Sequence, residues 1–453
     1  MTLKSINPVT KKVMKEFKTL SFNDVANEIK KLRNNLQKWK DIPVTKRVEY
    51  IKKVHDILLK DKQKYAEIIV KEVGRPIKHA IPEIEKCASL CKYYVDNAEK
   101  ILADQIVKTE AYKSYVRFEP LGVILGIMPW NYPFWQSFRW LIPSLTAGNI
   151  CVMKHASSVP QCALAIEEIA HKAGLKDYFK TLLIDSETAS KIIETDLIEG
   201  VSLTGSTGAG KAIGELAGRN LKKMVLELGG SDAFIVLDDA DVNFACKEAT
   251  ESRFLNSGQS CNAAKRFIVV QKVAKQFEDK LLDYVKNLKI GDPMDSATDI
   301  GPLANKNMLE NAERQVKDAI AKGAKILYGG HTLQKGYYFM PTVITNIKKN
   351  MLVANEETFG PIATIIVVKD EKEAIEEANR SIYGLGASIW TKNIKHAEEL
   401  IKRIEAGSVY VNKKVRSDPR LPFGGIKNSG IGRELGEYGL KEFVNIKSII
   451  IEK

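Results

Sequence analysis

The chain has 453 residues, a net charge of +13, and 44% hydrophobic and 28% charged residues. This length predicts two or three domains, and the composition is typical of a globular protein rather than a disordered or fibrous one. No apolar run reaches the ~18 residues of a membrane span, and the first residues lack the apolar segment of a signal peptide, so we expect a cytoplasmic protein without a membrane partner. The lysines are interspersed with glutamates, without an arginine-rich tract, which argues against a nucleic-acid partner.

The first hundred residues are predicted to be helical. Residues 44–73 repeat apolar side chains at helical spacing, and Gly74 marks the end of that helix. Cys87 and Cys91 lie one helical turn apart, and without a further Cys or His nearby they indicate a buried helix face rather than a metal site. None of the six cysteines shows paired metal-ligand spacing, and a reducing cytosol disfavours disulfides. We expect no bound metal.

Beyond these helices, residues 111–119 alternate like a strand with one solvent-exposed face. Short apolar runs then alternate with helix-compatible segments, which predicts an α/β protein with parallel sheets and helices on both faces. A first series covers residues 123–127, 150–153, 181–184, 200–203 and 223–226, and a second covers residues 267–270, 362–368, 386–390 and 408–411. The last apolar run, at residues 446–451, has no partner of its own in this pattern. With residues 105–120 it is predicted to form an arm that pairs with another subunit.

Two glycine-bearing turns carry a thiol and a carboxylate. Cys261 follows Asn-Ser-Gly-Gln-Ser, and Glu227 ends an apolar strand before Leu-Gly-Gly. A thiolate attacks an aldehyde, and the thiohemiacetal so formed can lose hydride to a nicotinamide and become a thioester. A partly buried carboxylate has a raised pKa, which suits a general base that activates the hydrolytic water. The alternatives are a packed cysteine and a strand-end carboxylate in a salt bridge.

A third motif, Pro-Trp-Asn-Tyr-Pro at residues 129–133, places the amide of Asn131 between two prolines. In their order, spacing and flanking residues, the three motifs resemble the NAD(P)-dependent aldehyde dehydrogenase family over nearly the whole chain. The resemblance implies that Cys261 is the nucleophile and Glu227 the general base. It also implies that the Cys261 backbone N–H and the Asn131 side chain hold the oxyanion. A turn-capping amide is the alternative role for Asn131.

The same resemblance implies a Rossmann-like NAD(P)-binding domain, an α/β catalytic domain and a β-strand oligomerisation arm. We place the first domain at residues 1–104 and 121–228, the second at residues 229–441, and the arm at residues 105–120 and 442–453. The arm predicts a homodimer or a homotetramer. A non-enzymatic binding protein with this fold is a remote alternative, against which the intact set of three motifs argues.

Residues 204–211, Thr-Gly-Ser-Thr-Gly-Ala-Gly-Lys, follow an apolar strand and open a helix. Free N–H groups at a helix start bind phosphate. The segment nearly spells the P-loop of nucleotide hydrolases, which is the competing interpretation, but Ala212 stands where such a loop needs Ser or Thr for magnesium. The resemblance implies instead that Gly205 and Ser206 contact the pyrophosphate of a dinucleotide.

The resemblance assigns further cofactor contacts. It includes Trp130 among them, implies that Glu357 and Phe359 hold the nicotinamide ribose, and implies that Lys154 meets the adenosine ribose. Ser157 stands where NAD-preferring members often carry Glu, and a serine places no negative charge against a 2′-phosphate. We therefore expect NADP to be used at least as well as NAD.

Arg139 lies at helical spacing after Asn131, in a mostly apolar helix start, which indicates an anionic partner. Succinate-semialdehyde dehydrogenases resemble the chain here and at Ser417, which implies that Arg139, Ser417 and Phe423 bind the substrate. A second arginine found in some of these enzymes is not evident, since Leu255 occupies its position. A lactaldehyde or glyceraldehyde dehydrogenase remains the alternative, and a structural salt bridge is the alternative role for Arg139.

Overall fold

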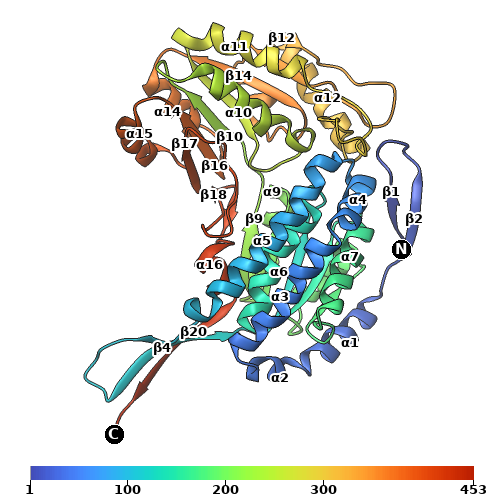
Figure 1. The fold of residues 1–453 in the computed structure, drawn as a ribbon, viewed down its shortest axis with the longest axis vertical. Coiled ribbons are helices and arrows are strands. Elements are labelled where there is room, and N and C mark those ends of the chain that lie inside the picture. The colour runs from blue at the N-terminus through green and yellow to red at the C-terminus, as the bar shows by residue number, and fades with distance from the viewer. Residues whose placement is uncertain (1) are drawn as a thin grey trace.

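The computed structural model describes residues 2–453 and divides them between two lobes and an extended arm (Figure 1). The lower lobe in Figure 1 combines a six-stranded sheet with the N-terminal helices, and the upper lobe contains a seven-stranded sheet. The arm projects from the lower lobe and carries the C-terminus. This arrangement confirms the predicted α/β class, whereas the exact domain boundaries stay a prediction.

The chain begins with an antiparallel hairpin of β1 (Thr2–Ile6) and β2 (Val13–Lys18). The prediction of helix throughout the first hundred residues is wrong at this point. The Asn7 side chain accepts hydrogen bonds from the backbone N–H groups of Val9 and Thr10, which fixes the turn after β1. Most of β2 is exposed, so its sequence lacks the apolar run that marks a buried strand.

Helices then cover residues 22–101, as predicted. They are α1 (Phe22–Arg33), α2 (Leu36–Asp41), α3 (Val44–Lys60), α4 (Lys62–Val73) and α5 (Ile77–Ile101). The helix expected over residues 44–73 is divided at Asp61, and Gly74 ends it with a left-handed φ of +78°. Among residues 2–453, no helix is both long and apolar enough to cross a membrane.

The six-stranded lobe continues with β5 (Val123–Met128), α6 (Pro133–Ala147), β6 (Ile150–His155), α7 (Pro160–Lys172), β7 (Phe179–Thr181), α8 (Ser186–Ile193), β8 (Gly200–Thr204), α9 (Thr207–Arg219) and β9 (Lys223–Glu227). These strands are parallel, in the order β9-β8-β5-β6-β7. The chain winds outward from β5 to β7 and then crosses back to β8. Ligands of such sheets bind at the carboxyl ends of the strands where the winding reverses, here between β5 and β8.

One strand of this sheet lies earlier than predicted. The run expected at residues 181–184 forms β7 at Phe179–Thr181. Leu182 and Ile184 are buried in the loop that follows, so the apolar sequence extends beyond the residues that pair with β6.

The seven-stranded lobe contains β10 (Asp232–Val236), α10 (Val242–Phe254), β11 (Ala264–Val270), α11 (Gln271–Lys286), α12 (Lys306–Ala321), β12 (Lys325–Tyr328), β13 (Thr342–Thr345), α13 (Leu352–Asn355), β14 (Ile362–Val368), α14 (Glu371–Asn379), β15 (Tyr383–Gly384), β16 (Gly386–Trp390), α15 (Ile394–Leu400) and β17 (Ser408–Val411). The sheet order is β12-β13-β14-β11-β10-β16-β17, and only β12 runs antiparallel to its neighbour. Separate apolar clusters pack on the two faces of this sheet.

The chain then returns to the six-stranded lobe through β18 (Ile426–Lys427), β19 (Gly430–Ile431), α16 (Gly436–Lys441) and β20 (Val444–Ile451). Strand β19 pairs with β9 and adds the sixth strand to that sheet. Strand β18 pairs with β15 of the other lobe, so this returning segment contacts both lobes.

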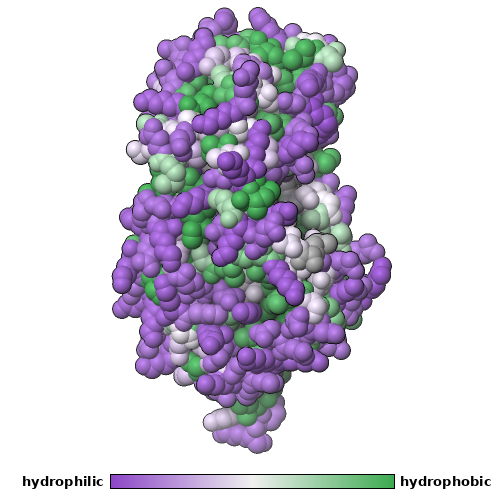
Figure 2. All heavy atoms as spheres, turned by 90° about the vertical axis from the view of Figure 1, so that its right-hand side faces the viewer, coloured by the Kyte–Doolittle hydropathy of each residue, from purple (hydrophilic) through white to green (hydrophobic). Residues whose placement is uncertain are grey.

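The arm is a three-stranded sheet of β20, β4 (Lys113–Pro120) and β3 (Gln105–Ile106). The expectation that residues 446–451 have no partner of their own is wrong, because β20 pairs with β4 of the same chain along its whole length. Ile446 and Ile450 remain 60% and 66% exposed. Figure 2 shows the arm at the bottom of the molecule, with apolar side chains among the polar ones.

Candidate active site

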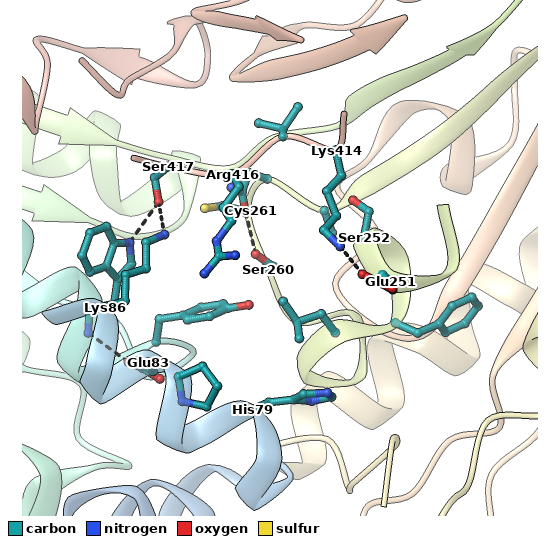
Figure 3. Close-up of a pocket in the computed structure, with 18 of the residues that line it drawn as sticks. His79, Glu83, Lys86, Glu251, Ser252, Ser260, Cys261, Lys414, Arg416 and Ser417 are labelled. Carbon is teal, nitrogen blue, oxygen red and sulfur yellow. Dashed lines mark hydrogen bonds and ion pairs between the residues drawn. The ribbon is translucent and has the colours of Figure 1, made fainter. Parts of the chain in front are cut away.

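A cavity of about 400 Å³ lies between the two lobes and is lined by residues of both (Figure 3). Helices α5 and α6 line it from the six-stranded lobe. The segments 250–263 and 414–417 line it from the other lobe, and Cys261 is among these lining residues. Across residues 2–453, no group of three or more His, Cys, Asp or Glu side chains could hold a metal ion.

The turn before Cys261 has an unusual backbone. Asn256, Ser257 and Gly258 adopt positive φ values of 53°, 54° and 75° in succession. A β-carbon at Gly258 would lie 2.2 Å from the carbonyl oxygen of Gly360, so this position requires glycine. The buried guanidinium of Arg253 donates to the carbonyl oxygens of both glycines, at 2.5 and 2.7 Å. This turn and the segment around Gly360 are therefore held as one unit.

The thiol of Cys261 lies in a mixed electrostatic environment. Burial raises its pKa to about 11, while the charges of Arg139 and Lys265 act in the opposite direction. A thiol with such a raised pKa keeps its proton at neutral pH. Attack on an aldehyde requires that this proton be transferred to an acceptor.

Asn131 points across the lobe boundary toward this turn. Its side-chain Nδ2 donates to the carbonyl oxygen of Gln259 at 3.1 Å, and its own carbonyl accepts from Arg75 and Asn256. It does not cap α6, which has no side-chain cap. The amide thus lies against the backbone that carries the thiol, where an oxyanion donor is needed.

Glu227 ends β9 and is 2% exposed. The guanidinium of Arg139 lies between two carboxylates, with Nε at 2.7 Å from Glu434 and Nη2 at 3.7 Å from Glu227. Burial raises the pKa of both glutamates, and the Arg139 charge opposes this shift. The arginine also stacks at 4.9 Å on the ring of Phe423. Arg139 lines the cavity, yet its charge is matched by carboxylates of the protein itself.

Another part of the cavity lining is centred on Ser417. Its Oγ accepts hydrogen bonds from the Nζ of Lys86 at 2.7 Å and from the indole Nε1 of Trp135 at 3.2 Å. The Lys86 ammonium stacks at 4.1 Å on the Trp135 ring. Figure 3 shows the guanidinium of Arg416 extending into the same cavity beside these groups.

The predicted phosphate and adenosine contacts follow the carboxyl ends of two strands that flank β5. Lys154 belongs to the end of β6, and Ser157 lies exposed just beyond it. Gly205 follows β8, and the exposed Ser206 caps α9 by accepting the N–H of Ala209. Both segments therefore lie at the carboxyl edge of the sheet, on either side of β5.

The predicted nicotinamide contacts lie nearer the thiol. Trp130 and Phe359 form an edge-to-face pair with ring centroids 5.7 Å apart, and they come from different lobes. Glu357 accepts hydrogen bonds from Lys265 at 2.9 Å and from the backbone N–H of Gly230 at 3.0 Å. Lys265 also donates to the backbone carbonyl of Cys261, so this ion pair lies beside the segment of the thiol.

Several residues of the site were not among the sequence predictions. Lys86, Arg416 and Glu434 face the groups described above, and Arg253 supports the turn of the thiol. Arg416 directly precedes the predicted Ser417, so a search for charge beside that serine would have found it. Lys86 and Arg253 carry no comparable local signal.

The family model for the aldehyde dehydrogenase family matches residues 1–449. The chain belongs to this family. It is 46% identical, over the full length of both chains, to a probable succinate-semialdehyde dehydrogenase [NADP(+)] of Synechocystis sp.. It is 40% identical, again over both full lengths, to succinate-semialdehyde dehydrogenase [NADP(+)] 1 of Mycobacterium bovis. A solved structure of succinic semialdehyde dehydrogenase from Streptococcus pyogenes with NADP+ matches with a TM-score of 0.97, 38% identity and full coverage of both chains.

Family membership confirms the predicted aldehyde dehydrogenase fold and the predicted enzyme class, an NAD(P)-dependent oxidoreductase that acts on an aldehyde. It decides against the nucleotide hydrolase and the non-enzymatic binding protein. The individual roles predicted for site residues stay predictions, and the geometry described above is the basis for the proposals that follow.

Proposed function

We propose that this enzyme oxidises succinate semialdehyde to succinate with NADP as the preferred cofactor. The observation that carries the proposal is one cavity lined both by the Cys261 thiol and by two cations without carboxylate partners, Lys86 and Arg416. An aldehyde with a carboxylate at its other end matches both features. The names of the Synechocystis and Mycobacterium relatives point to the same substrate and cofactor.

In the proposed mechanism, the Cys261 sulfur attacks the aldehyde carbon and the thiol proton moves to a basic group. The Cys261 backbone N–H and the Asn131 amide donate to the resulting oxyanion. NADP, when bound, supplies the hydride acceptor. Glu227 then accepts a proton from the water that hydrolyses the thioester, and the acid leaves with Cys261 restored.

The residues present fit a 2′-phosphorylated dinucleotide. Helix α9 presents the backbone N–H groups of its first turn beside Gly205 and Ser206, where a pyrophosphate can accept them. The side chain of Lys154 is nearly buried, and among residues 2–453 it forms no ion pair with a carboxylate, although the charge of Asp185 acts on it. The loop from 154 to 158 contains no acidic residue that would repel a phosphate. Trp130, Glu357 and Phe359 would border the nicotinamide.

The substrate proposal is tested with a panel of aldehydes and both cofactors, by following absorbance of the reduced nicotinamide. Succinate semialdehyde should give the highest kcat/KM, above butanal of similar length. A lactaldehyde or glyceraldehyde that outpaces succinate semialdehyde would replace the proposed substrate and leave the Cys261 chemistry unchanged.

For the cofactor, we expect Ser157→Glu to raise the KM for NADP by at least about tenfold, because the new carboxylate would oppose the 2′-phosphate. The KM for NAD should change little, since NAD carries only a hydroxyl there. Ser157→Ala is the matched control, because it removes the hydroxyl without adding charge and should keep NADP use. A native enzyme that fails with NADP at saturating aldehyde would contradict this assignment.

We also propose a cytoplasmic enzyme that assembles as a homodimer or homotetramer through the arm, without nucleic-acid or membrane partners. An exposed strand edge with apolar side chains is costly in water unless another chain covers it. Ile446 and Ile450 of β20 are such side chains. The domain limits predicted from the sequence are part of the same proposal.

Replacing Ile446 and Ile450 by lysine should therefore dissociate the oligomer, as measured by sedimentation. Lys447→Ala is the control, because this residue lies on the opposite face of β20 and forms an exposed ion pair with Glu119. It should leave the assembly intact. A native protein that sediments as a stable, active monomer would refute the role of the arm.

A further inference from the structure

We propose that Lys86 and Arg416, together with Ser417, bind the remote carboxylate of the substrate, and that Arg139 serves instead to position the carboxylate of Glu227. The inference rests on the proposed function, because it deepens the account of how the same cavity recognises an aldehyde with a terminal carboxylate. It adds two specificity residues that the sequence motifs did not indicate.

The charges that line the cavity are not balanced. Five cations line it, and three of them are already matched by carboxylates of the protein. Lys78 pairs with Asp299 at 2.6 Å, Lys414 pairs with Glu251, and Arg139 pairs with Glu434 and Glu227. Within the described part of the chain, Lys86 and Arg416 have no carboxylate at ion-pair distance. A carboxylate that enters the cavity therefore meets these two uncompensated charges.

The hydrogen-bond donors around Ser417 also indicate an anion site. Its hydroxyl oxygen has two lone pairs, and the N–H groups of Lys86 and Trp135 occupy both. The hydroxyl hydrogen must therefore point elsewhere, and across residues 2–453 no acceptor for it is found. The Lys86 ammonium likewise keeps N–H groups beyond the one it gives to Ser417. Donors without acceptors thus converge on one wall of the cavity, which is the arrangement that a carboxylate requires.

Lys86 is largely buried beside two other cations, which disfavours its charged form. Its surroundings combine burial with the neighbouring charges of Arg416 and Arg139, and together they lower the pKa of Lys86 to about 7. Asp418 acts in the opposite direction but does not reach ion-pair distance. A bound carboxylate would supply the missing negative charge. The free site is therefore electrostatically incomplete, and an anionic substrate completes it.

Arg139 differs in its ion pairing, although its buried Nε and Nη2 also lack hydrogen-bond acceptors. It is 2% exposed, its Nε lies 2.7 Å from Glu434, and its guanidinium is stacked on Phe423. Drawing this cation toward a substrate would leave Glu434 and Glu227 as buried, unpaired carboxylates, which is unfavourable. Arg139 is thus a positioning residue that acts through Glu227.

The test compares Lys86→Met and Arg416→Met, which remove charge while keeping a long side chain, with succinate semialdehyde and butanal as substrates. Each variant should lose about 10- to 100-fold in kcat/KM with succinate semialdehyde, mainly through KM, and little with butanal. Arg416→Lys, which restores a charge, should recover part of the loss. Lys414→Met is the matched control, because it removes a cavity cation that already has a partner. Its effect on succinate semialdehyde should be small.

Arg139→Met distinguishes the two assignments. As a positioning residue, Arg139 should affect kcat with both aldehydes alike, because Glu227 serves either substrate. A loss confined to KM for succinate semialdehyde in Arg139→Met, with Lys86→Met and Arg416→Met unaffected, would overturn the proposal. An equal loss with butanal in the Lys86 and Arg416 variants would also overturn it, since it would reveal a structural role.

A second measurement separates this inference from the proposed function. Succinate carries the carboxylates of the proposed product and should inhibit butanal oxidation competitively. Its inhibition constant should rise by about 10-fold or more in Lys86→Met and Arg416→Met. If the native enzyme does not prefer succinate semialdehyde to butanal, the proposed substrate fails, but succinate inhibition still decides the anion site. Unchanged inhibition in both variants would refute that site.

Discussion

Cys261→Ala is expected to lower aldehyde oxidation by at least about 10⁴-fold, because Cys261 is the one thiol among the residues that line the cavity. NADP binding, measured by calorimetry, should persist, since the predicted phosphate contacts lie at the edge of the six-stranded sheet. The fold should also persist, because the thiol only lines a cavity and alanine fits the same turn.

Cys246→Ala is the matched control for this experiment. Cys246 is buried in the apolar cluster of the seven-stranded lobe, away from the cavity, so its replacement should retain activity. Full turnover by Cys261→Ala would exclude the covalent mechanism altogether.

Glu227→Gln is expected to trap the thioester, because glutamine has nearly the same shape but cannot accept a proton from water. Steady-state turnover should fall by about 10²- to 10⁴-fold, while a rapid burst of reduced cofactor, one per active site, should remain. The measurement is stopped-flow absorbance followed by mass spectrometry of the acylated protein. A slow variant without a burst would show that Glu227 acts earlier, for example on the thiol proton.

The pH dependence of the same step provides a further check on Glu227. A general base works only when it is deprotonated, and burial raises the pKa of Glu227 above the ordinary range of a glutamate. Hydrolysis of the thioester should therefore increase with pH through this raised pKa, and at acidic pH it should limit turnover. The ascending limb should disappear in Glu227→Gln.

The fold was predictable where burial is extensive. Strands such as β5 and β14 are buried along almost their whole length, so their sequences are continuous apolar runs that indicate a strand directly. The hairpin of β1 and β2 was missed because β2 is mostly exposed, and its turn depends on one side chain, Asn7. The arm was recognised from an unpartnered apolar run, but its pairing with β4 required the three-dimensional structure.

The residues of the candidate site also fall into two groups, those that short motifs indicate and those that only the tertiary structure brings together. Cys261, Glu227 and Asn131 stand in short motifs, so their positions could be read from the sequence. Lys86 lies in the middle of a helix and donates a hydrogen bond to Ser417, 331 positions away in the chain. No local sequence pattern indicates such a long-range contact. The pairing of Arg139 with Glu434 also depends on the tertiary structure, because the sequence alone favoured an external anion as its partner.

The placement of the thiol and its base on separate sheets has a mechanical consequence. Cys261 is carried by a turn of the seven-stranded lobe, whereas Glu227 and Asn131 belong to the six-stranded lobe, and the Cys261 side chain packs against the apolar cluster of that second lobe. The distance between the thiol and its base therefore depends on contacts across the boundary, among them this packing and the hydrogen bond from Asn131 to Gln259. Small rotations of the lobes would change the alignment of reacting groups while both cores stay intact. Catalytic activity therefore depends on how the two lobes are aligned. We expect it to be lost under milder denaturing conditions than those that unfold either lobe.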